Sequence, residues 1–314
     1  MSASANTESK TSLKLSDLTV DNITKNAIQT NSETPNTRFK FLMEKLIDHL
    51  HNYIRETRLT TEEWTQTIQF LTSCGQISND VRQEFILLSD ILGVSVLVDA
   101  LNHPKPSNAT ESTVLGPFYT EDAVDVANGE SIASPNKGEI CLVLATVKNT
   151  RGEPIEGAKI DVWETDGNGL YDNQYENRDK PDMRGRLTTN NEGEFYFTCV
   201  KPVSYAVPTD GPVGKLLKEL HRRAYRPAHI HFRIYIPDSE YDDLVTALYV
   251  QDDPYLMSDA VFGVKKVLLL ILIIDVKKVE DATIAKMYDV KEQDWLIRYD
   301  FVMTTRNETQ ALIQ

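Results

Sequence analysis

The sequence predicts a mainly β protein, in which an antiparallel β-sandwich follows an N-terminal α-helical domain. Apolar residues recur at helical spacing from Arg38 to about Leu101, and Gly, Pro, Asn and Asp turns then separate short β-type runs about every ten residues. Residues 102–108 contain two prolines and have the composition of a linker. We therefore expect a disordered leader (1–37), a helical domain (38–109) and a β-sandwich catalytic domain (110–314).

The leader and the helices differ in composition and in apolar spacing. Residues 1–37 are rich in Ser, Thr and Asn and have no apolar core, so they predict neither a signal peptide nor a membrane-spanning segment. Three helices are expected after them, the second opening with a capping box at Thr60 and Glu63 and the third at about Asn79. Their apolar positions are Leu42, Leu46, Leu50 and Ile54 in the first, Trp64, Ile68 and Leu71 pointing inward in the second, and Val81, Phe85, Leu88, Leu92 and Val96 in the third. Such helices could form a small domain or a packing surface for a partner subunit.

Six apolar runs predict strands in the second part of the chain. They cover residues 140–147, 159–163, 193–200, 229–236, 244–250 and 267–274. The last run is too short to cross a bilayer and is rich in Leu and Ile, so it predicts a buried strand.

The composition is that of a soluble globular protein, with 41% hydrophobic and 25% charged residues. The formal net charge of -14 argues against nucleic acid or an anionic membrane surface as a partner. Three cysteines, Cys74, Cys141 and Cys199, are odd in number and far apart. They exclude a disulfide framework and predict reduced, mostly buried thiols in a cytoplasmic protein.

The stretch Arg226-Pro-Ala-His-Ile-His231 is the first candidate for chemistry. From His229 onward apolar residues recur at every second position, which predicts a strand, and residues two apart on a strand project from the same face. His229 and His231 would then point into one site, as a metal-binding pair requires. A pair of hydrogen-bonded core histidines fits the same pattern, and the pair alone leaves both interpretations open.

Two tyrosines in turn-rich segments extend this candidate site. Tyr171 follows Thr165-Asp-Gly-Asn-Gly-Leu170, and Tyr205 lies in the irregular stretch 203–212. Because the chain has 13 tyrosines, spacing alone does not select these two as metal ligands.

Three motifs, taken in order along the chain, resemble those of one known enzyme family. They are Trp163-Glu-Thr-Asp-Gly-Asn-Gly-Leu-Tyr171, the Tyr205 segment with Asp210-Gly-Pro-Val-Gly214, and Arg226-Pro-Ala-His-Ile-His231. In this order they are similar to the motifs of the intradiol ring-cleavage dioxygenases, and residues 110–119 and 151–158 resemble that family as well. The resemblance extends from about Arg38 to Val264. It points to the catechol and hydroxyquinol 1,2-dioxygenases, which carry an N-terminal helical domain, and residues 85–100 resemble the hydroxyquinol branch.

The resemblance implies a ferric enzyme. One non-haem Fe(III) per subunit would be bound by Tyr171, Tyr205, His229 and His231. Two phenolate oxygens are hard anionic donors that favour ferric iron, and two neutral imidazoles complete the set. The implied reaction cleaves a catechol-type diol, either catechol or hydroxyquinol, with O2 to a muconate- or maleylacetate-type diacid in aromatic catabolism. The family also implies a homodimer formed through the N-terminal helices.

Further residues receive roles from the same resemblance. Tyr205 is expected to act as a transient base, and Arg226 is expected to stabilise negative charge on the substrate ring, although a structural salt bridge would also explain this arginine. Asp99 is expected to meet the extra hydroxyl of hydroxyquinol, although a solvated charge is also typical of an aspartate near a helix end. The expected substrate wall consists of Val114, Leu115, Gly116, Pro117 and Phe118 on one side and Val207 and Pro208 on another, with Val261 or Phe262 as further candidates.

Two features depart from the family pattern. Ala247 stands where many relatives have a glutamine or histidine that supports the arginine, and loss of such a residue typically costs about 10–100-fold in activity. The apolar run 267–276 is longer than the family pattern, and we have no functional account of it. Two alternatives remain open, namely a small-molecule binding protein whose metal site has decayed and a zinc hydrolase built on the His-x-His pair. The zinc alternative lacks a third ligand, because the other histidines lie in no comparable strand context.

Overall fold

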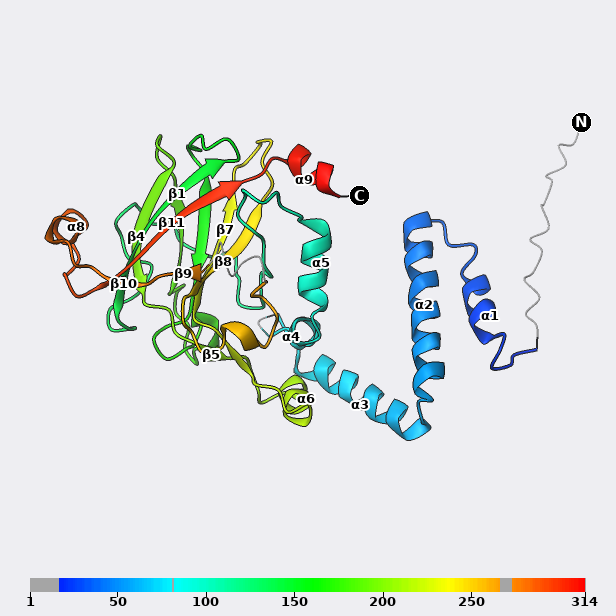
Figure 1. Ribbon diagram of the computed structural model, residues 1–314. Coiled ribbons are helices and arrows are strands. Elements are labelled where there is room, and N and C mark those ends of the chain that lie inside the picture. The colour runs from blue at the N-terminus through cyan, green and yellow to red at the C-terminus, as the bar shows by residue number, and fades with distance from the viewer. Residues whose placement is uncertain (1–16, 81, 266–272, 314) are drawn as a thin grey trace, which may run out of the picture. The chain divides into compact units, whose positions relative to one another are not determined.

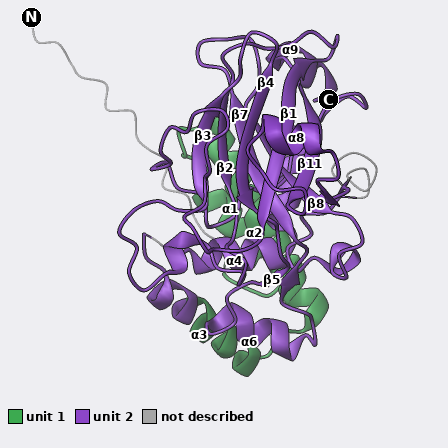
Figure 2. Ribbon diagram, turned by 90° about the vertical axis from the view of Figure 1, so that its left-hand side faces the viewer, with its two compact units in different colours: residues 1–71 green, residues 72–314 purple. Residues whose placement is uncertain are grey.

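The structure is a computed structural model that describes residues 17–80, 82–265 and 273–313. It contains two compact units, residues 1–71 and residues 72–314 (Figure 2). The boundary follows Leu71 and falls inside helix α3 (Thr61–Ile77). The next two helices, α4 (Glu84–Ile91) and α5 (Val94–Asn102), therefore belong to the same compact unit as the strands. The division into functional domains at residue 109 stays a prediction.

Helix ends in the first unit are set by local hydrogen bonds. Helix α2 (Thr37–Thr57) begins after Asn36, whose side chain accepts a hydrogen bond from the Phe39 N–H at 2.9 Å. The predicted capping box of α3 is confirmed, because the Thr60 N–H donates to Glu63 Oε2 at 2.8 Å and the Glu63 N–H donates to Thr60 Oγ1 at 3.2 Å. The capping-box pattern therefore marked the start of α3 correctly, whereas the Asn36 cap of α2 is a finding of the structure.

The predicted disordered leader is wrong for residues 23–30, which form helix α1 (Ile23–Thr30) and pack on α2 (Figure 1). Arg55 donates to Thr24 Oγ1 at 2.6 Å, and the same oxygen lies 2.9 Å from His51 Nδ1. The polar composition of this segment did not mean disorder, because its polar side chains supply the contacts to α2. Residues 1–16 lie outside the described residues.

Apolar side chains of α2 and α3 stay exposed, which contradicts the inward orientation predicted for the second helix. Trp64 is 53% exposed and Ile68 is 46% exposed. The apolar stripe of α2, from Leu42 to Ile54, is also uncovered. Within the first unit α1 packs against α2 and leaves this stripe to solvent. A helical apolar pattern thus predicted the stripe but not what covers it.

The predicted third helix is divided in two at Gly93, which has a φ of 73° between α4 and α5. This is the left-handed region that glycine adopts at helix ends. Leu87, Asp90 and Ile91 on α4 are buried, and Glu84 Oε1 accepts from the Val213 N–H of helix α6 (Pro212–Glu219) at 3.0 Å. Helix α4 is therefore anchored within the second unit. Val81 lies outside the described residues.

The strands of the second unit form two mixed sheets and one antiparallel pair (Figure 1). The strand order is β10-β11-β1-β4 in a four-stranded sheet, β3-β2-β7-β8-β9 in a five-stranded sheet and β5-β6 in a two-stranded sheet. The bounds are β1 (Ile140–Asn149), β2 (Lys159–Trp163), β3 (Arg184–Thr188), β4 (Glu194–Val200), β5 (Tyr205–Ala206), β6 (Tyr225–Arg226), β7 (His229–Tyr235), β8 (Leu244–Val250), β9 (Ile273–Ile274), β10 (Lys277–Lys278) and β11 (Trp295–Met303). Short helices follow or interrupt them, namely η1 (Asp172–Gln174), η2 (Leu256–Ser258), α8 (Ala282–Met287) and α9 (Arg306–Leu312).

The strand prediction is confirmed for most runs and corrected in three respects. The runs 140–147, 159–163, 193–200, 229–236 and 244–250 correspond to β1, β2, β4, β7 and β8. The expectation of purely antiparallel sheets is wrong, because β1 pairs with β11 and β8 pairs with β9 in parallel. The description as mainly β is also wrong, since helices hold more of the described residues than strands. Strand β11 was missed, and most of the 267–274 run lies outside the described residues.

Both larger sheets contribute to one hydrophobic core. Val143, Phe197 and Phe301 come from the four-stranded sheet, and Ile160, Phe232 and Leu248 come from the five-stranded sheet. The rings of Phe232 and Phe301 lie 4.9 Å apart between centroids. The three cysteines are buried and unpaired, as predicted. In the described ranges, no helix is both long enough and apolar enough to cross a membrane.

Candidate active site

Strand β7 presents the two histidines on one face, as the two-residue spacing predicted. The Nε2 atoms of His229 and His231 lie 3.0 Å apart, and both side chains are buried. Nδ1 of His229 lies 2.6 Å from the Pro227 carbonyl oxygen. Because a carbonyl can only accept, Nδ1 carries the proton and Nε2 carries the lone pair, which is the tautomer that a metal ligand needs.

Two loops bring the predicted tyrosines beside each other. The Oη atoms of Tyr171 and Tyr205 lie 3.1 Å apart, and both rings are buried. Tyr171 comes after a turn in which Gly169 has a φ of 82°, and a Cβ at Gly169 would lie 2.9 Å from Cβ of Tyr205. The turn therefore needs glycine at this position. The close approach of the two loops brings the hydroxyl groups of the two tyrosines together.

Arg226 connects the tyrosine pair to the histidine pair. In the two-stranded sheet Tyr205 and Arg226 are directly opposite each other, so their side chains share a face. Nη1 of Arg226 donates to Tyr205 Oη at 3.3 Å and lies 3.1 Å from His229 Nε2. The oxygen and nitrogen donors therefore surround one small, buried space.

Burial is the largest cause of the pKa shifts of His229, His231 and Tyr171 in this space. Burial, followed by the charge of Arg226, lowers the pKa values of His229 and His231 well below the ordinary value, so both imidazoles are neutral at neutral pH. Burial, followed by the neighbouring Tyr205, raises the pKa of Tyr171 well above its ordinary value. The Tyr171 phenol would therefore ionise only beside a cation.

The four donors fit a ferric ion. Two neutral imidazoles have their Nε2 atoms together, and two phenols have their oxygens together. A trivalent cation would bind the imidazoles in neutral form and would hold the phenols in ionised form. In the described part of the chain, no group of three or more His, Cys, Asp and Glu side chains could hold a metal. The zinc alternative therefore gains no third ligand there, whereas the tyrosines suit iron.

A cavity next to the four donors is lined by every residue predicted for the substrate wall. These are Val114, Leu115, Gly116, Pro117, Phe118, Val207 and Pro208. The further candidate Val261 lines it as well, whereas Phe262 does not. The enclosed space is about 10 Å³, and an adjoining cavity of about 340 Å³ shares Leu87, Pro117, Phe118 and Pro208 with it. These four side chains lie between the inner site and the outer space.

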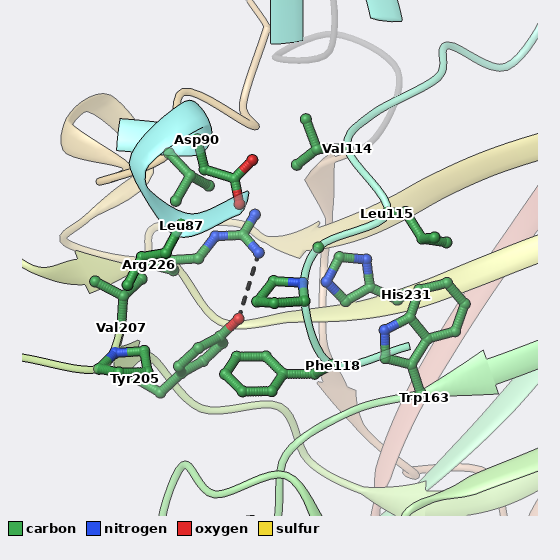
Figure 3. A pocket seen from close by; sticks show the side chains of 14 residues that line it. Leu87, Asp90, Val114, Leu115, Phe118, Trp163, Tyr205, Val207, Arg226 and His231 are labelled. Atoms are coloured by element: carbon green, nitrogen blue, oxygen red, sulfur yellow. Dashed lines mark hydrogen bonds between the residues drawn. The ribbon is translucent and has the colours of Figure 1, made fainter. Parts of the chain in front are cut away.

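The structure adds residues to the cavity that the sequence analysis missed. Figure 3 shows Asp90 and Arg226 at one end of the cavity and Trp163 and His231 at the other. The Trp163 ring stacks on His231 with 4.8 Å between centroids, because the two residues are opposite each other in β2 and β7. An acid three residues after Leu87 on a helix was the available signal for Asp90, since residues at that spacing share a face.

Asp99 does not lie in this cavity. Its carboxylate oxygens contact Lys265 Nζ at 2.6 Å, Ser112 Oγ at 2.8 Å and His103 Nδ1 at 3.1 Å. Asp99 lines an outer pocket that adjoins the inner cavity and shares Asp90, Val114, Leu115 and Gly116 with it. Asp90 is 2% exposed, and burial raises its pKa while Ser95 and Arg226 oppose the increase. Of the two acids, only Asp90 lines the cavity that also contains Tyr205, His231 and Arg226.

Comparisons with known proteins agree with the arrangement of the site. Residues 114–305 match a family model described as dioxygenase, and residues 36–110 match one described as catechol dioxygenase N terminus. The chain is 52% identical over 298 residues to the intradiol ring-cleavage dioxygenase hqdA of Aspergillus niger, a match that covers 95% of this chain and 88% of the relative. It is 46% identical over 270 residues to a hydroxyquinol 1,2-dioxygenase of Rhizobium sp., covering 85% of this chain and 89% of that protein.

A solved structure supports the same assignment. The hydroxyquinol 1,2-dioxygenase of Pseudomonas putida DLL-E4 superposes with a TM-score of 0.82 at 43% identity, covering 91% of this chain and 99% of that one. The chain therefore belongs to the intradiol ring-cleavage dioxygenases. Within that enzyme family it falls in the branch that contains the hydroxyquinol 1,2-dioxygenases.

Proposed function

We propose that this protein cleaves hydroxyquinol with O2 between its two adjacent hydroxylated carbons, giving a maleylacetate-type diacid, and that catechol is a poorer substrate. The observation that supports this most strongly is the meeting of Tyr171, Tyr205, His229 and His231 beside Arg226 in one buried space. The hydroxyquinol-cleaving relatives, at 43–46% identity, support the choice of diol. The binding-protein alternative is not favoured, because all the donors of the metal site and the arginine are together.

Fe(III) held by the two tyrosines and the two histidines would be the cofactor. When bound, ferric iron would supply a Lewis acid that favours the ionised form of the diol, and covalency between the metal and this electron-rich diolate would make the ring reactive toward O2.

The residues around the cofactor have separate tasks in this proposal. Oη of Tyr205 accepts a proton from the diol, and Nη1 of Arg226, 3.3 Å from that oxygen, stabilises the negative charge that builds on the substrate. Phe118, stacked on Tyr171 with 4.4 Å between centroids, and the apolar wall exclude water from the reacting centre. Trp163 fixes the plane of His231 by stacking.

Oxygen uptake by the ferric-loaded protein tests the proposed function. Hydroxyquinol should be consumed with one equivalent of O2 and should yield the ring-opened diacid, with catechol consumed more slowly. The loaded protein should absorb in the visible, because tyrosinate-to-iron charge transfer gives ferric phenolates their colour. A colourless protein that stays inert on both diols after ferric loading would disprove the proposal.

Asp90 is proposed to select hydroxyquinol, in place of Asp99. An acid that bonds the third hydroxyl would be left unpaired by catechol, which penalises the smaller diol. We expect Asp90→Asn to lower the hydroxyquinol-to-catechol ratio of kcat/KM by about 10-fold or more. Asp99→Ala is the matched control and should leave the ratio unchanged. A change in the ratio in Asp99→Ala but not in Asp90→Asn would show that Asp99, and not Asp90, selects hydroxyquinol.

We also propose that two chains pair through the N-terminal helices and that each sheet-bearing part is a β-sandwich. The exposed apolar stripe of α2 supports the pairing, since a soluble chain rarely leaves such a stripe uncovered. The shared core of the two larger sheets supports the sandwich. Light scattering should give twice the chain mass of 35.6 kDa, and a mass of one chain at micromolar concentration would contradict the pairing. The free, buried cysteines are consistent with a cytoplasmic location.

A further inference from the structure

The guanidinium of Arg226 divides its hydrogen bonds between two sides. Nη1 points to the reacting groups, Tyr205 Oη and His229 Nε2. On the other side, Nε donates to Asp259 Oδ1 at 3.1 Å, and Nη2 donates to Asp259 Oδ2 at 3.4 Å and to Tyr249 Oη at 3.2 Å. Asp259 and Tyr249 therefore fix one edge of the guanidinium while the other edge faces the substrate.

The register of β7 and β8 explains why Tyr249 reaches the arginine. His231 is opposite Ala247 and His229 is opposite Tyr249. Ala247 and Tyr249 are two residues apart on one strand, so both side chains project from the face that carries the histidines. The methyl group of Ala247 has no polar atom to offer. The Tyr249 ring, tilted against His229 with 5.2 Å between centroids, brings its hydroxyl to Nη2 of Arg226 instead.

Asp259 is held in turn by its own loop. Its Oδ2 accepts from the Gly263 N–H at 2.9 Å, and its Oδ1 accepts from the Val261 N–H at 3.3 Å. The Gly263 carbonyl accepts from Thr113 Oγ1 at 3.0 Å, and this contact is buried. The loop that carries Val261 into the cavity wall is thus the loop that orients the carboxylate.

Gly263 leaves no free space beside the guanidinium. A Cβ at this position would lie 2.8 Å from Arg226 Nη2, 2.8 Å from Tyr249 Oη and 3.0 Å from Asp259 Oδ2. Any other residue would push apart the groups that hold Arg226. We refer to Tyr249, Asp259 and Gly263 as the Arg226 clamp.

We propose that the Arg226 clamp positions Nη1 of Arg226 for the reaction, and that Tyr249 supplies the support that Ala247 lacks. The inference rests on the proposed function, because Arg226 affects the rate only if negative charge develops beside it. An arginine side chain has several rotatable bonds, so a fixed guanidinium requires partners on the edge away from the substrate. Electrostatic stabilisation depends on such prior orientation, since donors that must reorient contribute less in the transition state.

Tyr249→Phe tests the clamp with the least disturbance, because the ring stays and only the hydroxyl is removed. We expect kcat to fall about 10–100-fold, the usual effect of losing a supporting residue. The dissociation constant of hydroxyquinol, measured without oxygen, should change less than about 3-fold, because the clamp acts on charge that develops later. Gly263→Ala should reproduce the fall in kcat while keeping every polar partner.

Tyr299→Phe is the matched control. Tyr299 lies on β11, where its ring packs on Phe301 with 4.7 Å between centroids, and it is not part of the clamp. Removing its hydroxyl should leave kcat and diol binding near the wild-type values.

A crystal structure of the metal-free Tyr249→Phe protein gives a readout that does not depend on turnover. We expect the guanidinium to rotate so that Nη1 leaves hydrogen-bond distance of Tyr205 Oη. An unmoved guanidinium overturns the clamp, and so does a kcat within about 2-fold of wild type or a loss confined to diol binding. Failure of the wild-type protein to cleave either diol would instead reject the proposed function, and the crystal structure would still decide whether the clamp holds Arg226.

Discussion

Tyr171→Phe should abolish tight ferric binding and lower ring-cleavage activity by more than about 100-fold, beyond the usual effect of losing a residue that only supports a metal site. Tyr171 is fully buried and its ring stacks on Phe118 at an interplanar angle of 17°. Phenylalanine keeps this stacking and removes the oxygen alone. The loss would therefore reflect a missing metal donor and not a packing defect.

Iron content per chain after ferric loading, together with visible absorbance, measures this effect directly. Tyr196→Phe serves as the matched control, because Tyr196 lies on β4 and its ring packs on Tyr288 with 5.0 Å between centroids. The control should bind iron and keep its colour. Full iron content and full colour in Tyr171→Phe would show that Tyr171 is not a ligand.

Asp172→Ala is expected to lower stability more than any surface change, with a loss of about 3–5 kcal/mol and a Tm lower by about 6–15 °C. Asp172 is fully buried and accepts from Arg184 Nε at 3.0 Å, from Arg178 Nε at 2.8 Å and from the Asp182 N–H at 3.1 Å. Removing the carboxylate would leave Arg184, whose side chain is 2% exposed, as an unpaired buried charge. The loop that carries Tyr171 would lose its anchor at the same time.

Thermal unfolding of the metal-free protein measures this loss without interference from iron binding. Glu153→Ala is the control, because Glu153 forms an exposed ion pair with Arg151 at 2.8 Å. Exposed pairs contribute little, so the Tm of the control should stay within about 1 °C of wild type. Equal effects of the two substitutions would contradict the importance assigned to Asp172.

The same ion pairs make stability depend on pH in the acid range. Burial tends to raise the pKa of Asp172, but the hydrogen bonds and charge of Arg184 outweigh it and lower the pKa overall. A hydrogen bond from Arg178 lowers the pKa of Asp122 to about 2. A carboxyl whose folded pKa is lowered stabilises the fold above its unfolded pKa of about 3.9, and this contribution is lost as the pH falls through the folded pKa. In denaturant unfolding, lowering the pH from 7 to 2 should therefore reduce the free energy of unfolding less in Asp172→Ala than in wild type.

Much of the fold could be predicted because strand patterns are local. Strands β2 and β8 have the predicted bounds, since turn-forming residues flank their apolar positions on both sides. Strand β11 was missed because Arg298 and Asp300 interrupt its apolar residues, and only pairing with β1 over nine residues shows that it is a strand. Strand β3 carries two arginines that are neutralised by aspartates distant in the chain, which no local pattern reveals.

By itself the sequence determined the chemistry of this protein. The spacing of His229 and His231 placed both on one strand face, and the family motifs added Tyr171, Tyr205 and Arg226, all of which the structure brings together. Only the tertiary structure decided which acid faces the cavity, Asp90 and not Asp99, and which residues hold the arginine. The physical reason is that these neighbours lie on different elements, α4, β8 and the loop after η2, and meet only through packing.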